Sequence, residues 1–240
     1  MGAADRYCGA CGTVRTEHLE RVRARHQRDR RTHTRAMLAV AIGFVMAMAL
    51  PTVIEFALLG DEESESEWSD VLLSGLSGIL AIGGVALTLG MSAIRTGIDS
   101  LGPLRVWIAA PFLAAGTFAI SHYWVELLRV SADASAEIEA LSTVVWLYIV
   151  IGAPLIEELL CRWAIFGALR QVVGVRQSVV VAAAIFAMLH ALNGGIFLEL
   201  PHRFLVGIGL GWIRVSGGSV WPAVLAHALH NLAAVVTTAG

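Results

Sequence analysis

The sequence predicts an all-α, polytopic integral membrane protein with about seven transmembrane helices, and three observations lead to that class. Hydrophobic residues make up 57% of the 240 residues, and the mean hydropathy is +0.71, which is far from the composition of a soluble domain. Apolar runs near the roughly 20 residues that a bilayer requires recur along the chain. Basic and acidic residues gather in alternate connections between these runs, as expected for oriented membrane helices.

Residues 1–35 are expected to form a polar, arginine-rich arm on the cytoplasmic side. All 17 basic residues are arginine, and nine of them precede residue 36. Such a segment is typical of a solvated helix beside anionic lipid headgroups, and nucleic-acid binding is the poorer interpretation. Cys8 and Cys11 form a Cys-x-x-Cys pair that resembles half of a zinc knuckle, so a zinc site there needs further ligands. An unstructured tail is the alternative.

Residues 36–140 are expected to hold three accessory spans, at 36–60, 71–94 and 104–128. Pro51 predicts a kink in the first span, because proline cannot donate a backbone hydrogen bond. Glycine and serine in the second span favour close helix contacts.

Residues 141–240 are expected to hold four further spans, at 141–173, 178–192, 196–215 and 220–239. The first of them is too long for a straight crossing, so its continuation after Arg162 is expected at the membrane interface. The third is interrupted near its outer end by Glu199, Pro201, His202 and Arg203, which can act as a helix cap. Gly207 and Gly211 predict close packing of this span on a neighbour within the protein.

The distribution of charge predicts the orientation of the bundle. Arginine-rich connections alternate with acidic or neutral ones, so the positive-inside rule puts the N-terminus in the cytoplasm and the C-terminus outside. The expected location is the inner (cytoplasmic) membrane, crossed several times.

Two adjacent carboxylates, Glu157 and Glu158, lie inside one of the apolar runs together with Arg162. Charge at that depth costs at least about 2.5 to 3.5 kcal/mol, so an intramembrane glutamate indicates a functional site. Glu158 and Arg162 are four residues apart, which predicts an ion pair on one helix face. Glu157 points about 100° away from Glu158. Its partner must therefore come from another helix.

Polar residues in two other spans are candidates for that partner. Phe186 and His190 are four residues apart in one span, and His227 and Asn231 are four residues apart in the last, which also carries His230. A lone histidine in a span is commonly a helix-to-helix hydrogen-bond partner. Three helices that contribute to one set can instead supply a base, a group that orients it, and donors for an oxyanion.

This set suits hydrolysis of a peptide bond by an activated water. A glutamate shielded from bulk water can act as a general base, with a histidine sharing the proton. Serine or cysteine catalysis is less favoured, since Cys161 has no histidine near it in sequence. Glu157, His190 and His227 could also form a two-histidine, one-glutamate zinc site. No His-Glu-x-x-His motif supports that alternative.

Three motifs in order resemble the CAAX-protease and bacteriocin-processing (Abi) family of glutamic intramembrane endopeptidases. They are Glu157-Glu158-x-x-x-Arg162, Phe186-x-x-x-His190 and His227-x-x-x-Asn231, the last preceded by a glycine-rich lead-in from Phe204 to Pro222. The resemblance covers about residues 141–235. It implies that Glu157 and His190 activate the water and that His227 and Asn231 bind the oxyanion. It also implies that Glu158, Arg162 and Phe186 support the site, and that no cofactor is needed.

The expected partners are a peptide or protein substrate at the membrane and the lipid bilayer, without nucleic acid. One rival interpretation is a non-catalytic membrane scaffold or immunity protein of the same fold. Another is a transporter or proton relay, because buried glutamate and histidine also line ion pathways. The sequence selects neither the substrate nor the oligomeric state.

Overall fold

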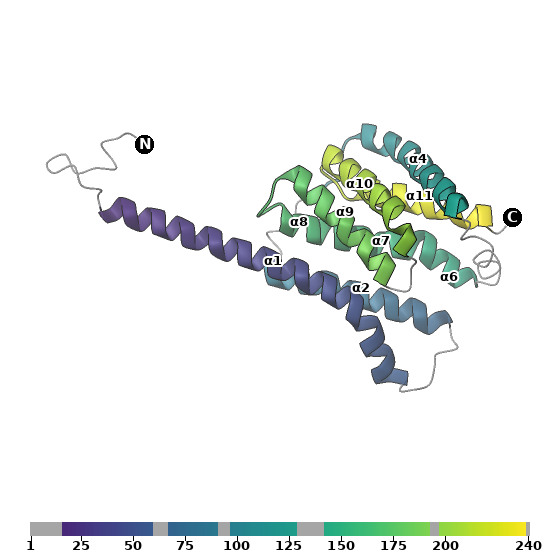
Figure 1. The fold of residues 1–240 in the computed structure, drawn as a ribbon, viewed down its shortest axis with the longest axis horizontal. Coiled ribbons are helices and arrows are strands. Elements are labelled where there is room, and N and C mark those ends of the chain that lie inside the picture. Colours follow the sequence, from purple (N-terminus) through teal and green to yellow (C-terminus); the bar gives the residue numbers. More distant parts are fainter. Residues whose placement is uncertain (1–15, 60–66, 91–96, 129–141, 193–196, 239–240) are drawn as a thin grey trace.

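The computed structural model describes residues 16–59, 67–90, 97–128, 142–192 and 197–238. Every regular element in these ranges is a helix, as the sequence predicts (Figure 1). Five helical stretches are long and apolar enough to cross a membrane. The helices are α1 (Thr16–Leu59), α2 (Glu67–Leu89), α4 (Leu104–Leu128), α6 (Thr143–Leu147), η2 (Tyr148–Gly152), α7 (Ala153–Glu158), η3 (Leu159–Ile165), α8 (Phe166–Leu169), α9 (Val175–Leu192), η4 (Phe197–Glu199), α10 (Leu200–Gly217) and α11 (Trp221–Thr238).

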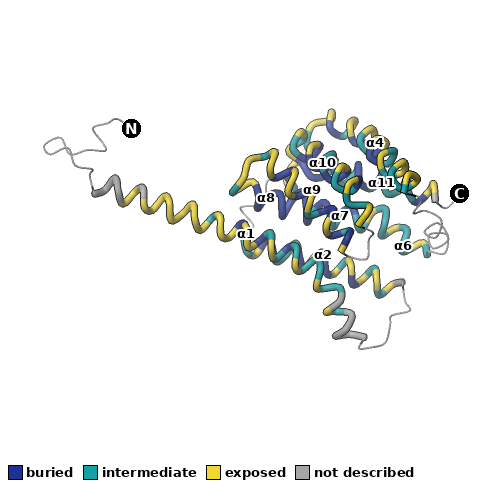
Figure 2. The backbone as a smooth tube through the Cα atoms, in the orientation of Figure 1, coloured by how far each residue is buried: buried dark blue, intermediate teal, exposed yellow. Residues whose placement is uncertain are grey.

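Helix α1 runs without interruption from the arginine-rich arm into the first span. Its N-terminal part projects away from the other helices (Figure 1) and is exposed (Figure 2). Near its C-terminal end the helix bends, in the part that contains Pro51, as expected where a proline removes a backbone hydrogen bond. The arm and the first span therefore belong to one continuous helix. They differ in that the arm is exposed, whereas the span packs against other helices. Cys8 and Cys11 lie outside the described residues.

The helix that carries the two glutamates is continuous from Thr143 to Leu169 but changes its winding twice. The segments η2 and η3, on either side of α7, are π-helical. Each π-turn adds a residue and changes the direction of the side chains after it. The residues after Arg162, predicted to continue at the membrane interface, are buried against α1, α2 and α9. Their apolar side chains are part of the largest hydrophobic cluster among the described residues.

Helix α10 packs closely on α9 through Gly207 and Gly211. A Cβ atom at Gly207 would lie 3.0 Å from the Cα atom of Ala183, and one at Gly211 would lie 2.9 Å from Cγ1 of Val179. Backbones can approach this closely only where side chains are absent. The prediction that these glycines serve packing within the protein is therefore confirmed.

Helices α10 and α11 are not among the five candidate membrane spans, but they run alongside α4, which is one of the five. Trp124, near the end of α4, donates to the carbonyl of Leu198 at 2.8 Å, just before α10. Ser219, after α10, donates to the carbonyl of Ser100 at 2.6 Å, just before α4. Helix α10 thus extends over the length of α4, and α11 packs against α4 as well. The arrangement agrees with the predicted set of about seven membrane helices.

Candidate active site

Glu158 and Arg162 form the buried ion pair that their spacing predicts. Nε of Arg162 lies 3.3 Å from Oε2 of Glu158, and the arginine and glutamate side chains are 1% and 0% exposed. Arg162 also donates from Nη2 to the carbonyl of Gly207 at 3.2 Å. Its guanidinium carbon lies 4.3 Å from the centre of the Phe186 ring. The pair thereby connects the helix with the two π-turns to α10 and α9.

Glu158 has a second partner that the sequence did not indicate. Nδ1 of His227 lies 3.0 Å from Oε1 of Glu158. Because the carboxylate is already paired with a guanidinium, it acts as an acceptor, and the proton of this bond belongs to Nδ1 of the histidine. Glu158 therefore orients His227 with its other ring nitrogen, Nε2, toward Glu157.

Glu157 finds the partners that its own helix lacks in α9 and α11. Its Oε2 atom lies 3.5 Å from Nε2 of His190 and 3.8 Å from Nε2 of His227. Nδ1 of His190 lies 2.9 Å from the carbonyl oxygen of Phe186. A carbonyl can only accept, so His190 also carries a proton on Nδ1 and turns Nε2 toward the glutamate. Three helices thus bring one carboxylate oxygen and two imidazole nitrogens together.

Phe186 lies at the centre of this group. Its ring centroid is 4.5 Å from that of His190 and 5.7 Å from that of His227, and Arg162 covers its face. Such contacts restrict the rotamers of both histidines. The supporting position expected for Phe186 is therefore consistent with the geometry.

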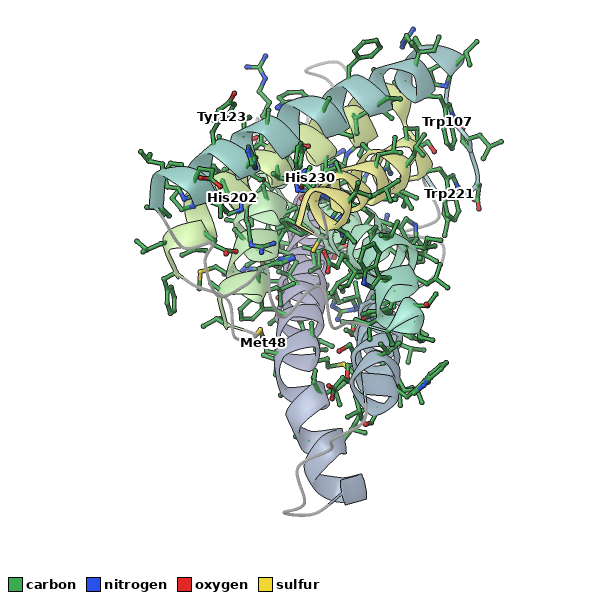
Figure 3. All side chains as sticks on the ribbon, turned by 90° about the vertical axis from the view of Figure 1, so that its right-hand side faces the viewer. Met48, Trp107, Tyr123, His202, Trp221 and His230 are labelled. Carbon is green, nitrogen blue, oxygen red and sulfur yellow. The ribbon has the colours of Figure 1, made fainter. Side chains whose placement is uncertain are left out.

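Asn231 and His230, which neighbour each other on α11, point in different directions. Asn231 donates from Nδ2 to the carbonyl of Ile149 in η2 at 2.8 Å, and its amide keeps a second N–H. Nδ1 of His230 lies 3.0 Å from the hydroxyl of Thr117 in α4. Figure 3 shows His230 beneath α4, away from Met48 on α1. His230 is thus part of the α4 to α11 contact.

An open cavity of about 820 Å³ reaches the glutamate. The described residues that line it are Ala47, Met48, Pro51, Ser74, Ser77, Gly78, Tyr148, Ala153, Ile156, Glu157, Leu160, Cys161, Phe186, Leu189, His190, Leu192 and Arg203. Its size falls in the upper part of the range of about 300–1,000 Å³ that ligand pockets occupy.

Sequence reasoning missed Arg203 as a residue of this cavity. Arg203 and Glu199 were expected to cap the outer end of a span, and they do form an ion pair of 2.6 Å. The same arginine lines the cavity that contains Glu157. Its interruption of an apolar run was the only available signal. Among the described residues, no three His, Cys, Asp or Glu side chains are grouped so that they could hold a metal ion.

The helices and the buried Glu and His side chains define a polytopic membrane protein with a polar site inside the bundle, and comparison with known proteins agrees. Residues 139–233 match the family model of the type II CAAX prenyl endopeptidase, Rce1-like. A Bacillus subtilis (strain 168) protein, "Putative membrane peptidase YdiL", is 23% identical over 215 residues, which cover 82% of this chain and 84% of that protein. No solved structure matches significantly. The segment that carries the candidate site thus resembles the type II CAAX prenyl endopeptidase family, and the chain as a whole is similar to "Putative membrane peptidase YdiL".

Proposed function

We propose that the chain is a glutamic-type intramembrane endopeptidase that hydrolyses a peptide bond of a substrate at the membrane. The observation that carries this proposal is the convergence of Glu157, His190 and His227 at an open cavity. By the positive-inside rule the N-terminus is cytoplasmic, in the inner membrane of a cell. The side chains of the site can perform the reaction without a cofactor.

The hydrogen bonds around the site turn three acceptor atoms toward one another. Both histidines use Nδ1–H as a donor, so in their neutral forms both Nε2 atoms present lone pairs to Oε2 of Glu157. A water molecule between them can donate its hydrogens to these acceptors, which suits the site for holding the attacking water. The separations of 3.5 and 3.8 Å are looser than a direct hydrogen bond, as is common in substrate-free active sites.

In the proposed reaction, water attacks the carbonyl carbon of the scissile peptide while Glu157 and His190 accept its proton. Asn231 has a second N–H for the resulting oxyanion. His227 can donate to the same oxygen from Nε2 when both of its ring nitrogens are protonated. Glu158, 3.0 Å from Nδ1, stabilises that charged ring. The C–N bond then breaks as the proton moves from the glutamate and histidine to the leaving amine.

The test compares peptide termini by mass spectrometry in membranes that contain the wild-type chain or the Glu157→Gln chain at equal expression. Glu126→Gln is the matched control, because Glu126 is an exposed glutamate near the end of α4. We expect new termini with the wild type and the control, and none with Glu157→Gln. Identical termini in all three membranes, with a phenotype on deletion of the gene, would instead favour the non-catalytic scaffold.

A further inference from the structure

Part of the cavity wall comes from helices outside the matched segment. Three of the lining residues belong to α1, namely Ala47, Met48 and Pro51, and three belong to α2, namely Ser74, Ser77 and Gly78. The family match begins only at residue 139. We call these six residues the α1–α2 wall; Met48 is labelled in Figure 3.

The α1–α2 wall is fixed directly against the site. A side chain at Gly78 would collide with Ile156, which also lines the cavity and precedes Glu157. At the contact between α1 and α2, a Cβ atom at Gly43 of α1 would lie 2.7 Å from Cγ2 of Val85. Both glycines are needed for these close approaches. A shift of the wall would therefore change the space beside Glu157.

Two of the hydroxyl groups at the cavity, those of Tyr148 and Ser74, lie beside each other at the α1–α2 wall. Tyr148, the first residue of η2, lines the cavity, and its side chain interacts with that of Ser74. Gly152 leaves room for the tyrosine ring, because a Cβ atom there would lie 2.7 Å from Cδ2 of Tyr148. A phenol and an alcohol can each donate and accept a hydrogen bond. They are thus able to satisfy main-chain groups of a peptide.

We propose that the α1–α2 wall binds an uncharged, apolar segment of the substrate beside the scissile bond. The hydroxyl groups of Tyr148 and Ser74 bind the main chain of that segment. This inference rests on the proposed function. The six wall residues carry no charge, so among the described residues of the wall a charged substrate side chain finds no partner, and an unpaired charge at that depth is unfavourable. Main-chain groups of an inserted peptide must be satisfied by the protein.

The first experiment measures kcat and KM in proteoliposomes with internally quenched peptides that differ at one position among leucine, aspartate and arginine. We expect the wild type to prefer the leucine peptide by at least about tenfold in kcat/KM. Ser74→Asp should shift the preference toward the arginine peptide by about tenfold. Leu72→Asp is the control, because Leu72 is 67% exposed and lies outside the cavity lining. Equal behaviour of the two variants would overturn the proposal while the peptidase activity stands.

Tyr148→Phe tests the proposed hydrogen bond from the Tyr148 hydroxyl to the main chain of the substrate. Loss of a neutral hydrogen bond to the main chain is expected to raise KM about threefold to tenfold, with little change in kcat, because the bond exists in both the bound and the transition state. A fall in kcat at constant KM would contradict this role and would indicate a part in the chemical step.

A binding experiment separates failure of the wall from failure of the proposed function. The Glu157→Gln chain in proteoliposomes is irradiated with the leucine peptide carrying a benzophenone, and the labelled residues are mapped by mass spectrometry. We expect labels on α1 and α2 at the wall. Unlabelled leucine peptide should compete with this labelling, and the aspartate peptide should need at least about a tenfold higher concentration to compete equally. Labels only elsewhere would overturn the inference, whether or not the wild type cleaves any peptide.

Discussion

At the scale of single residues, Glu157 and Glu158 have the same chemistry but opposite surroundings. Glu158 is fully buried between Arg162 and His227, so its charge is used in holding side chains in place. Glu157 is 31% exposed and reaches the cavity with one oxygen near two histidines. The environment thus suits one carboxylate for orientation and the other for proton transfer.

This difference predicts opposite effects on stability. Glu158→Gln leaves the Arg162 charge buried without its carboxylate, and breaking a buried pair in this way costs about 3–5 kcal/mol. Glu157→Gln removes no such pair and should unfold close to the wild-type temperature. Thermal unfolding in detergent, followed by tryptophan fluorescence, measures both. Equal unfolding temperatures for the two variants would show that the ion pair does not stabilise the fold.

The two histidines of α11 provide a matched pair for activity. His227→Phe removes the ring between Glu157 and Glu158, and loss of one oxyanion donor commonly lowers kcat by about 100-fold to 1,000-fold. His230→Phe removes only the hydrogen bond to Thr117, so its kcat should stay within about tenfold of wild type. Peptide cleavage at equal amounts of folded protein is the measurement. Similar losses in both variants would argue against a direct role for His227.

At the scale of helices, the sequence predicts which segments are helical better than how they are wound. The run predicted at 104–128 coincides with α4, because hydropathy and length are local properties. The π-turns on either side of α7 leave no comparable pattern. The bond from Arg162 to the Gly207 carbonyl joins residues 45 positions apart, and no local spacing encodes it. The motifs named the residues of the candidate site, but their mutual bonds depend on how the helices pack.

The contact between α9 and α10 predicts a different effect for two glycines. Gly207→Val should push α10 away from Ala183 and move the carbonyl that binds Arg162, since a Cβ atom there would already lie 3.0 Å from the Ala183 backbone. A Cβ atom at Gly116 of α4 would meet no atom within 4 Å, so Gly116→Val should be tolerated. Unfolding temperature and peptide cleavage should fall together in the first variant only. Loss in both would mean that valine itself, rather than the contact, is responsible.

At the scale of the whole molecule, the contacts at the two ends of α4 indicate how many helices cross the bilayer. Seven spans and five spans both put the termini on opposite sides of the membrane. The two alternatives differ in where the loop between α10 and α11 lies. The structure brings that loop to the start of α4 through the Ser219 bond to Ser100. The positive-inside rule predicts a cytoplasmic start for α4. The loop between α10 and α11 is then cytoplasmic as well, which favours seven spans.

Cysteine labelling tests this topology. Single cysteines at Phe197, before α10, and at Ser216, near its end, are introduced into a chain in which Cys8, Cys11 and Cys161 are replaced by alanine; both positions are exposed. A membrane-impermeant maleimide should label Phe197→Cys in intact cells and Ser216→Cys only after permeabilisation, because α10 then lies across the bilayer. Labelling of both in intact cells would mean that α10 and α11 remain outside. In that case Arg203 and the histidines of α11 would approach Glu157 from the outer surface, and the site would be open to external water.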